Sequence, residues 1–418
     1  MRLSDAFETL KAMRILLVGG GGREHAIAWR LARDAPEADL HAAPGNPGIA
    51  EHATCHGVDA DDVEALAGLA QRLRPDLVVV GPEAPLAAGV ADELARRSIE
   101  VFGPSATAAQ IEGSKAFAKD VLRAAEVPTA EPLARAVAPC VVKADGLAAG
   151  KGVFVCHTDA EAEEAVDAAA AFGGDVLVEE LLEGEELSVF ALCDGVRALP
   201  LGAARDYKRL GDGDEGPNTG GMGTFTPVPG FDRDEIEELV AQIHEPVLTE
   251  LRRRGTPFVG VLFAGLMLTA DGPRVLEFNC RFGDPETQSL LPSLDGDLAR
   301  LLRAAASGDL TGARRPELVR SAVTVVVAGR HYPSRSDVGT PIGGIEEARA
   351  AGALVFHAGT AVVDGRVVTN GGRILNVVGV ADDVAGARAV AYGGVGRIEL
   401  PGARYRTDIA STNERVRG

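Results

Sequence analysis

The sequence is poor in cysteine and lysine and has no long hydrophobic run. Its five cysteines are scattered, with no C-x-x-C pair and no Cys/His spacing typical of zinc, which favours a reducing cytoplasm. No apolar run reaches the roughly 18 residues of a membrane span, and residues 1–12 are too polar and acidic for a signal peptide. We therefore expect a cytoplasmic protein without a membrane partner, whose residues 1–12 form an extension before the first strand.

Positive charge is scarce as well. The 418 residues include 42 lysines and arginines against 61 aspartates and glutamates, a net charge of −19. This balance disfavours nucleic-acid backbones and anionic membranes as partners, so we expect small-molecule ligands and a monomer, with a weak homodimer as the alternative. An anionic substrate would need basic groups gathered locally. Only six residues are lysine, and in a chain so rich in arginine each retained lysine calls for a reason: Lys11, Lys115, Lys119, Lys143, Lys151 and Lys208.

The order of apolar runs predicts a multidomain protein of mixed α/β and α+β class. Residues 14–18 read as a strand, 19–22 as a turn and 23–33 as a helix, and this alternation predicts a doubly wound parallel sheet over 13–112. We expect a second domain over 113–330 that contains a small lid at about 131–199. Short strands, glycine-rich turns and one helix predict a small α+β domain over 331–418.

The first glycine turn, Gly19 to Gly22 followed by Arg23 and Glu24, opens a helix whose free N–H groups suit a phosphate. It fails as a dinucleotide fingerprint because the third glycine would fall at Glu24, and because Asn46 follows the second strand where a ribose-binding carboxylate is expected. A phosphorylated sugar fits this turn better than NAD does. The alternative is a turn that only packs tightly.

A second glycine loop lies between two short apolar runs, 140–142 and 153–156, and carries Lys143, Gly146, Gly150, Lys151 and Gly152. A P-loop is rejected because only three residues separate Gly146 from Gly150, no Ser or Thr follows Lys151, and a strand comes next. The pattern predicts a hairpin that holds phosphates. A surface hairpin with solvated lysines is the alternative.

Three polar segments complete the candidate site. Glu277 and Asn279 end a strand on one face, which suits Mg²⁺ shared with ATP phosphates, unless they are an ordinary exposed edge. The strand end at Glu179 and Glu180 offers backbone groups to adenine, with Glu186 for ribose, unless it is a solvated acidic turn. The loop over 206–223 is rich in glycine and charge and contains Lys208, and it could be merely a surface loop.

Together these segments resemble the ATP-grasp superfamily and, within it, the phosphoribosylamine–glycine ligase family. The resemblance runs from residue 13 to about 409, and its ordered blocks are residues 21–26, 43–46, 80–86, 112–115, 143–152, 216–223, 277–286, 357–360 and 369–373. It implies a pre-ATP-grasp sheet, a central ATP-grasp domain and a small C-terminal domain. It also implies that ATP, glycine and 5-phosphoribosylamine give glycinamide ribonucleotide, ADP and phosphate through glycyl phosphate, in purine biosynthesis.

The resemblance also assigns roles to residues. ATP would be bound by Lys115, Lys143, Gly146, Gly150, Lys151, Gly152, Glu179, Glu180, Leu182 and Glu186. Glu277 and Asn279 would hold Mg²⁺ or Mn²⁺. The catalytic candidates are Arg281, Asp284, Glu286 and Lys208. Phosphoribosylamine and the acceptor site would involve Gly20, Gly21, Gly22, Arg23, Glu24, Asn46, Gly81, Pro82, Glu83, Asn218, Thr219, Gly220 and Gly221.

The sequence departs from the family pattern at Tyr207, where the family generally has histidine, and at Gly265–Met267, which offers no further metal-binding acid. Two rival functions share most of these motifs. One is another ATP-grasp ligase or carboxylase, and the other is a nucleotide-binding protein without chemistry.

Overall fold

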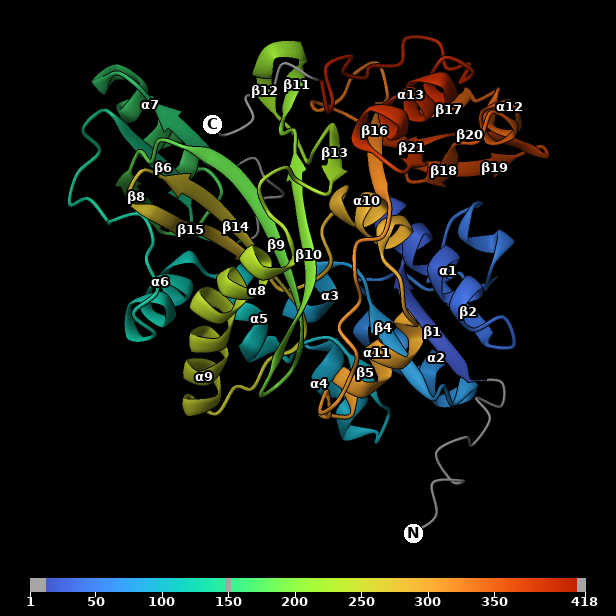
Figure 1. Ribbon diagram of the computed structural model, residues 1–418, viewed down its shortest axis with the longest axis horizontal. Coiled ribbons are helices and arrows are strands. Elements are labelled where there is room, and N and C mark those ends of the chain that lie inside the picture. Colours follow the sequence, from blue (N-terminus) through green and yellow to red (C-terminus); the bar gives the residue numbers. More distant parts are fainter. Residues whose placement is uncertain (1–12, 147–151, 412–418) are drawn as a thin grey trace.

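The computed structural model describes residues 13–146 and 152–411 (Figure 1). Its N-terminal part is a five-stranded parallel sheet in the order β3-β2-β1-β4-β5, which confirms the predicted doubly wound sheet. The strands are β1 (Arg14–Gly19), β2 (Asp39–Pro44), β3 (Thr54–Cys55), β4 (Leu77–Val80) and β5 (Val101–Phe102). The helices are α1 (Gly22–Asp34), η2 (Ile49–Glu51), α2 (Val63–Leu73), α3 (Glu83–Ala87) and α4 (Val90–Arg96).

The strand order reverses between β1 and β4, because the chain goes from β1 outward to β3 and then returns to β4. In open α/β sheets the crevice beyond the carboxyl ends of such strands is where ligands bind. Gly19 ends β1, and Gly81 follows β4 and donates its N–H to the Val18 carbonyl at 3.0 Å. Both predicted glycine segments therefore lie at this crevice.

Two helices, α5 (Ala106–Gly113) and α6 (Lys115–Ala124), connect this sheet to the central region. The two helices are separated at Ser114, whose extended backbone ends α5. The Ser114 hydroxyl accepts the N–H of Phe117 at 3.2 Å and so caps α6.

A small three-stranded sheet, β7-β6-β8, carries the lysine and glycine loop. Its elements are β6 (Cys140–Ala144), β7 (Val153–Cys156), α7 (Asp159–Ala170) and β8 (Val176–Glu180). Strands β6 and β7 are antiparallel, with Lys143 opposite Val153, which confirms the hairpin and the rejection of a P-loop. Gly150 and Lys151 lie outside the described residues.

The large sheet has eight strands in the order β15-β14-β9-β10-β13-β16-β21-β18. The strands are β9 (Glu185–Asp194), β10 (Ala198–Asp206), β13 (Gly223–Thr226), β14 (Val259–Thr269), β15 (Gly272–Asn279), β16 (Ser321–Ala328), β18 (Leu354–His357) and β21 (Arg373–Ala381). Strand β9 and the start of β10 fall within the lid predicted at about 131–199, but they belong to this large sheet rather than to the small one. The C-terminal strands continue the same sheet through β13 and β16, rather than only packing on it.

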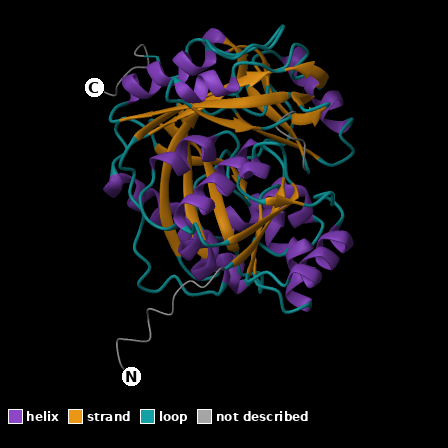
Figure 2. Cartoon of the chain, turned by 90° about the vertical axis from the view of Figure 1, so that its right-hand side faces the viewer, coloured by secondary structure: helices purple, strands orange, loops and turns teal. Residues whose placement is uncertain are grey.

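The remaining elements surround these sheets, and Figure 2 shows helices lying against the long strands. There are two further small sheets. One pairs β11 (Arg209–Gly211) with β12 (Glu215–Asn218), and the other contains β17 (Asp337–Pro341), β19 (Thr360–Val363) and β20 (Arg366–Gly371). The other helices are η3 (Asp212–Asp214), α8 (Arg233–Leu239), η4 (Val240–His244), α9 (Glu245–Arg253), α10 (Glu286–Ser293), α11 (Leu298–Ala306), α12 (Ile345–Ala350) and α13 (Val384–Val395). Among the described residues no helix is long and apolar enough to cross a membrane.

The helical segment from Arg233 to Arg253 contains a π-helical turn, η4, between α8 and α9. Pro246 explains it, since proline has no N–H to donate four residues back and its ring crowds that carbonyl. The Glu245 N–H instead donates to the Val240 carbonyl, five residues earlier.

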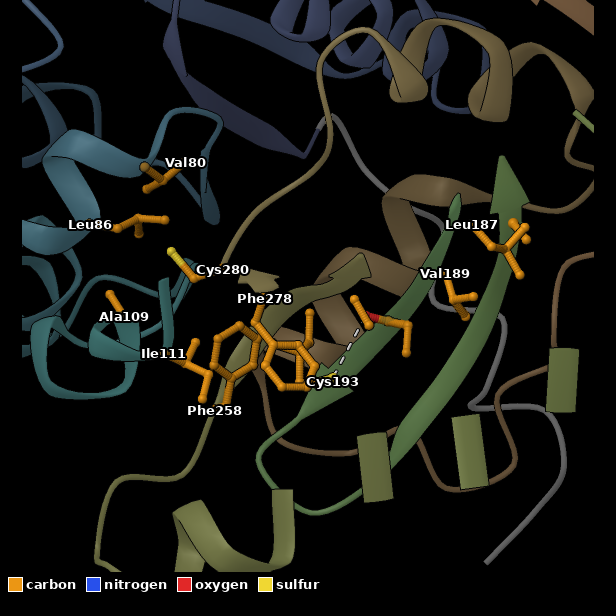
Figure 3. Close-up of a cluster of buried hydrophobic side chains, with 14 of the residues drawn as sticks. Val80, Leu86, Ala109, Ile111, Leu187, Val189, Cys193, Phe258, Phe278 and Cys280 are labelled. Carbon is orange, nitrogen blue, oxygen red and sulfur yellow. Dashed lines mark hydrogen bonds between the residues drawn. The ribbon is translucent and has the colours of Figure 1, made fainter. Parts of the chain in front are cut away.

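One core links the N-terminal sheet to the end of β15, where Phe278 lies beside Phe258 and Ile111 (Figure 3). Phe278 is buried in this core, and its neighbours Glu277 and Asn279 line the cleft described below. Because side chains alternate along a strand, Glu277 and Asn279 share one face of β15.

Candidate active site

A cleft of about 860 Å³ lies between the N-terminal sheet, the large sheet, the small sheet and the C-terminal region. It brings together most of the residues predicted from sequence: Arg23, Pro82, Glu83, Lys115, Lys143, Gly146, Gly152, Glu179, Glu180, Leu182, Glu186, Lys208, Asn218, Thr219, Gly220, Glu277, Asn279, Arg281, Asp284 and Glu286. The predicted residues that do not line it are Gly20, Gly21, Gly22, Glu24, Asn46, Gly81 and Gly221. The two predicted ends of the site, nucleotide and sugar, thus share one cavity.

The nucleotide end is basic because three lysines line it. Lys143 and Lys119 form ion pairs with the two oxygens of Glu179, each at 2.6 Å, and Glu179 is only 1% exposed. Lys115 donates to the Gly146 carbonyl at 3.1 Å, at the start of the glycine loop. Burial lowers the pKa of Lys115, although the Glu277 carboxylate opposes that shift.

The metal candidates, Glu277 and Asn279, stand at the end of β15. Within the described part of the chain no hydrogen bond or ion pair occupies the Glu277 carboxylate, and no group of three or more His, Cys, Asp or Glu side chains is arranged to hold a metal. Two oxygen donors fit a hard cation such as Mg²⁺, which usually keeps water and takes further oxygens from substrate phosphates. The donor set therefore fits a metal shared with a nucleotide.

Lys208 sits among carboxylates on the opposite wall. It forms an ion pair with Glu186 and lies 4.0 Å from Asp206. Burial alone would lower the pKa of Lys208, but Asp206, Glu186 and Glu277 together raise it well above its usual value. Lys208 therefore stays charged, and its charge lowers the pKa of Glu186.

Arg281 follows β15 and is held between two carboxylates from the N-terminal half. Its Nε lies 3.1 Å from Glu83, and its terminal nitrogen lies 3.2 Å from Glu112. Glu112 also accepts the Cys280 N–H at 2.7 Å, so it fixes the backbone beside Arg281 as well as the guanidinium. The end of β15 and the crevice beyond β1 and β4 are thereby joined.

Asp284 and Glu286 lie near an arginine cluster that consists of Arg23, Arg281 and Arg373. Arg373, at the start of β21, lies 2.8 Å from the Asp284 carboxylate and also donates to the Gly220 carbonyl. Burial would raise the pKa of Asp284, yet Arg373 and Arg23 lower it overall. For Glu286, burial and the nearby Asp206 raise the pKa to about 7. Two carboxyl groups only two residues apart thus have pKa values shifted in opposite directions.

The glycine turn is built around Glu24 rather than around an open cavity. The Glu24 carboxylate accepts the Gly21 N–H at 2.7 Å, and a Cβ at Gly81 would lie 2.1 Å from its oxygen. Asn46 uses its amide fully on backbone: it donates to the Gly20 and His357 carbonyls and accepts from Gly48 and Ile49. These side chains shape the crevice, and their contact with substrate stays a prediction.

Several charged lining residues were given no role from sequence, among them Lys119, Glu112, Asp206 and Arg373. The scarcity of lysine already singled out Lys119, but its partner Glu179 lies 60 positions away. Arg373 fell inside a quoted block of the C-terminal domain, yet nothing local predicted that it reaches Asp284. The structure also shows what Tyr207, a departure from the family pattern, contacts. Its hydroxyl accepts the Ala410 N–H at 2.8 Å, and its ring lies under the Arg406 guanidinium.

The fold and the cleft define an ATP-grasp enzyme: a lysine-bearing hairpin faces a strand end with two oxygen donors across a nucleotide-sized cavity. Solved structures under 25% identical share this fold. The MgADP-bound biotin carboxylase domain of Hydrogenobacter thermophilus 2-oxoglutarate carboxylase is 18% identical, with a TM-score of 0.68 over 94% of this chain and 91% of that chain.

Family models identify the particular family. The phosphoribosylglycinamide synthetase N domain matches residues 13–112, the ATP-grasp (A) domain matches 113–287 and the C domain matches 322–412. The chain belongs to the phosphoribosylglycinamide synthetase family, which confirms the predicted resemblance.

Individual relatives agree over nearly the full length. Phosphoribosylamine–glycine ligase from Streptomyces coelicolor is 51% identical over 418 residues, covering 96% of this chain and 99% of the relative. The same enzyme from Mesorhizobium japonicum is 48% identical over 414 residues, covering 95% and 97%. The crystal structure of phosphoribosylamine–glycine ligase from Thermotoga maritima has a TM-score of 0.80 at 33% identity and covers 95% of this chain and 100% of that chain.

Proposed function

We propose that this protein is an ATP-dependent ligase that joins glycine to 5-phosphoribosylamine and releases glycinamide ribonucleotide, ADP and phosphate, a step of purine biosynthesis. The observation that carries the proposal is the single cleft in which the lysine hairpin, the two oxygen donors of β15 and the arginine cluster meet. Family membership and the names of the relatives support the same substrates.

The chemistry follows from the poor reactivity of a carboxylate as an acyl donor. A glycine carboxylate oxygen attacks the γ-phosphorus of ATP, and the bond to the β-phosphate oxygen breaks to give glycyl phosphate and ADP. The amine of phosphoribosylamine then attacks the glycyl carbonyl, the bond from that carbon to the phosphate oxygen breaks, and one amine proton is lost. Such a reaction asks the protein mainly to position reactants and balance charge.

The residues divide this work between the two ends of the cleft. We assign Lys115, Lys143 and the glycine loop to the phosphates, and the backbone at Glu179–Leu182 with Glu186 to adenine and ribose. Mg²⁺, or Mn²⁺ as an alternative, would be held by Glu277 and Asn279 and would supply further positive charge to the phosphates.

The acceptor end belongs to the arginine cluster. Arg281, Arg23 and Arg373 suit a carboxylate or phosphate of the substrates, because guanidinium groups bind such oxygens in pairs. Glu286, with its pKa raised to about 7, suits the acceptance of the proton that the amine loses. We infer a cytoplasmic monomer from the sequence, and both points stay predictions.

The test is to incubate the protein with ATP and Mg²⁺ and to add glycine, phosphoribosylamine and bicarbonate in separate combinations. We expect ADP formation that requires glycine and a ribonucleotide product that requires both glycine and the amine. A carboxylase would instead respond to bicarbonate, and a protein without chemistry would bind ATP without turnover. ADP release that ignores glycine would overturn the assignment.

A further inference from the structure

We propose that Lys119 is a positioning residue for nucleotide binding: it balances the charge of Glu179, so that the positive charge of Lys143 is not cancelled and its ammonium group stays available to phosphate. The proposal rests on the function proposed above, since it concerns how this cleft binds a nucleotide. It assigns a role to a lysine that the reaction scheme does not use.

The contacts of Lys119 are with protein oxygens. Its ammonium group forms an ion pair with Glu179 at 2.6 Å and donates to the Thr129 hydroxyl and to the Ala130 carbonyl, each at 2.7 Å. Two of its three N–H groups are thus used in hydrogen bonds, and its charge is paired with Glu179. Although Lys119 lines the cleft, it is turned toward protein oxygens.

Lys143 differs in this respect. It pairs with the other Glu179 oxygen at 2.6 Å and donates to the Leu276 carbonyl at 3.1 Å. Within the described residues Lys143 thus makes one hydrogen bond where Lys119 makes two, and it keeps more N–H capacity for a ligand at the cleft. The two lysines and one carboxylate carry one net positive charge, in a place where burial weakens screening by water.

Lys119 also helps to hold the Lys143 ammonium group in position. Thr129, which it contacts, donates its hydroxyl to the Val275 carbonyl at 2.7 Å, while Lys143 binds the carbonyl of Leu276 on the same strand. Lys119 lies on α6, Glu179 on β8 and Lys143 on β6. The network therefore ties the small sheet that carries the glycine loop to β15, which carries the two oxygen donors.

The scarcity of lysine agrees with this role. The chain uses arginine at most basic positions, yet it has lysine at both ends of this network. Three oxygens, from Glu179 and from the adjacent Thr129 and Ala130, suit a compact ammonium better than a planar guanidinium fork.

The experiment measures ADP binding by calorimetry on the full chain. Lys119→Met removes one charge and leaves Glu179 paired with Lys143 alone, so the net charge falls to zero and we expect ADP to bind at least tenfold more weakly. The double variant Lys119→Met/Glu179→Gln restores one net positive charge, and we expect its ADP affinity to return to within about threefold of wild type. Arg123→Met, on the same helix but exposed and paired only with Asp120, is the matched control and should not change affinity.

The outcomes separate the possibilities. If Lys119→Met binds ADP as wild type does, or if the double variant remains as weak as the single one, the positioning role is wrong. In the second case Lys119 contacts the nucleotide itself. Should Lys119→Met fail to fold, the charge-balanced double variant decides by the same threefold criterion. Failure of the wild-type chain to bind ADP would instead refute the proposed function.

Discussion

Glu83 provides a quantitative test of how the N-terminal sheet is joined to the arginine cluster. Its carboxylate lies 3.1 Å from Arg281 and 3.9 Å from Arg23. Burial would raise the pKa of Glu83, but the two guanidinium groups outweigh it and lower the pKa to about 2. We predict that Glu83→Gln, which keeps the shape and removes the charge, destabilises the protein at neutral pH.

The pKa shift sets the size of this effect. A fall from 4.5 to about 2, at about 1.4 kcal/mol per pKa unit, gives about 3 kcal/mol. The side chain is 28% exposed, and water screens part of the interaction, so we expect roughly 1–3 kcal/mol. Because the folded pKa is lowered, this stability is fully present above the unfolded pKa of about 4.5 and is lost as the pH falls toward 2.

Urea unfolding of wild type and Glu83→Gln at pH 7 and at lower pH measures the difference. It should be largest at pH 7 and shrink as the acid transition is approached. Glu64→Gln is the control: Glu64 pairs with Arg97 at 2.8 Å, but its side chain is 77% exposed and its removal should cost less than about 0.5 kcal/mol. Equal effects of the two substitutions, or a Glu83 difference that is constant with pH, would refute the reasoning.

Three further predictions concern the site. Glu277→Gln should lower glycine-dependent turnover by about 100-fold and raise the Mg²⁺ concentration needed, because one of two oxygen donors loses its charge; normal turnover at ordinary Mg²⁺ would contradict the ligand role. Glu286→Gln should lower kcat by about 10²-fold or more, and the wild-type rate should rise with pH through about 7, because the proton acceptor must be ionised; a variant that keeps this pH step would exclude Glu286. Tyr207→Phe should reduce stability by about 1–3 kcal/mol in urea unfolding, because the Ala410 N–H loses its acceptor, and a change below about 0.5 kcal/mol would show that this bond is unimportant.

Local patterns were sufficient for the elements that carry the nucleotide end. The strand–loop–strand setting of Lys143 and the alternation at Glu277–Asn279 both follow from neighbouring residues. The β9–β10 hairpin was missed, because its strands are buried apolar runs without clear alternation. Asp194-Gly195, at its turn, was the available signal.

Contacts between distant segments could not be predicted. The pairing of β13 with β16, which makes the C-terminal strands part of the large sheet, depends on register across about 100 residues. The same holds for Glu112 with Arg281 and for Arg373 with Asp284, because each pair is brought together only by the packing of two domains. The scarcity of lysine marked Lys119 as unusual, but only its three oxygen partners indicate a role.

The central claim is that glycine is activated as an acyl phosphate in this cleft, and oxygen transfer tests it most directly. Glycine labelled with ¹⁸O in its carboxylate should be incubated with the protein, ATP, Mg²⁺ and phosphoribosylamine, and the released phosphate analysed by mass spectrometry. Because a glycine oxygen bonds to phosphorus and leaves with it, each phosphate formed should carry one ¹⁸O atom. Phosphate without label, formed together with glycinamide ribonucleotide, would contradict the account.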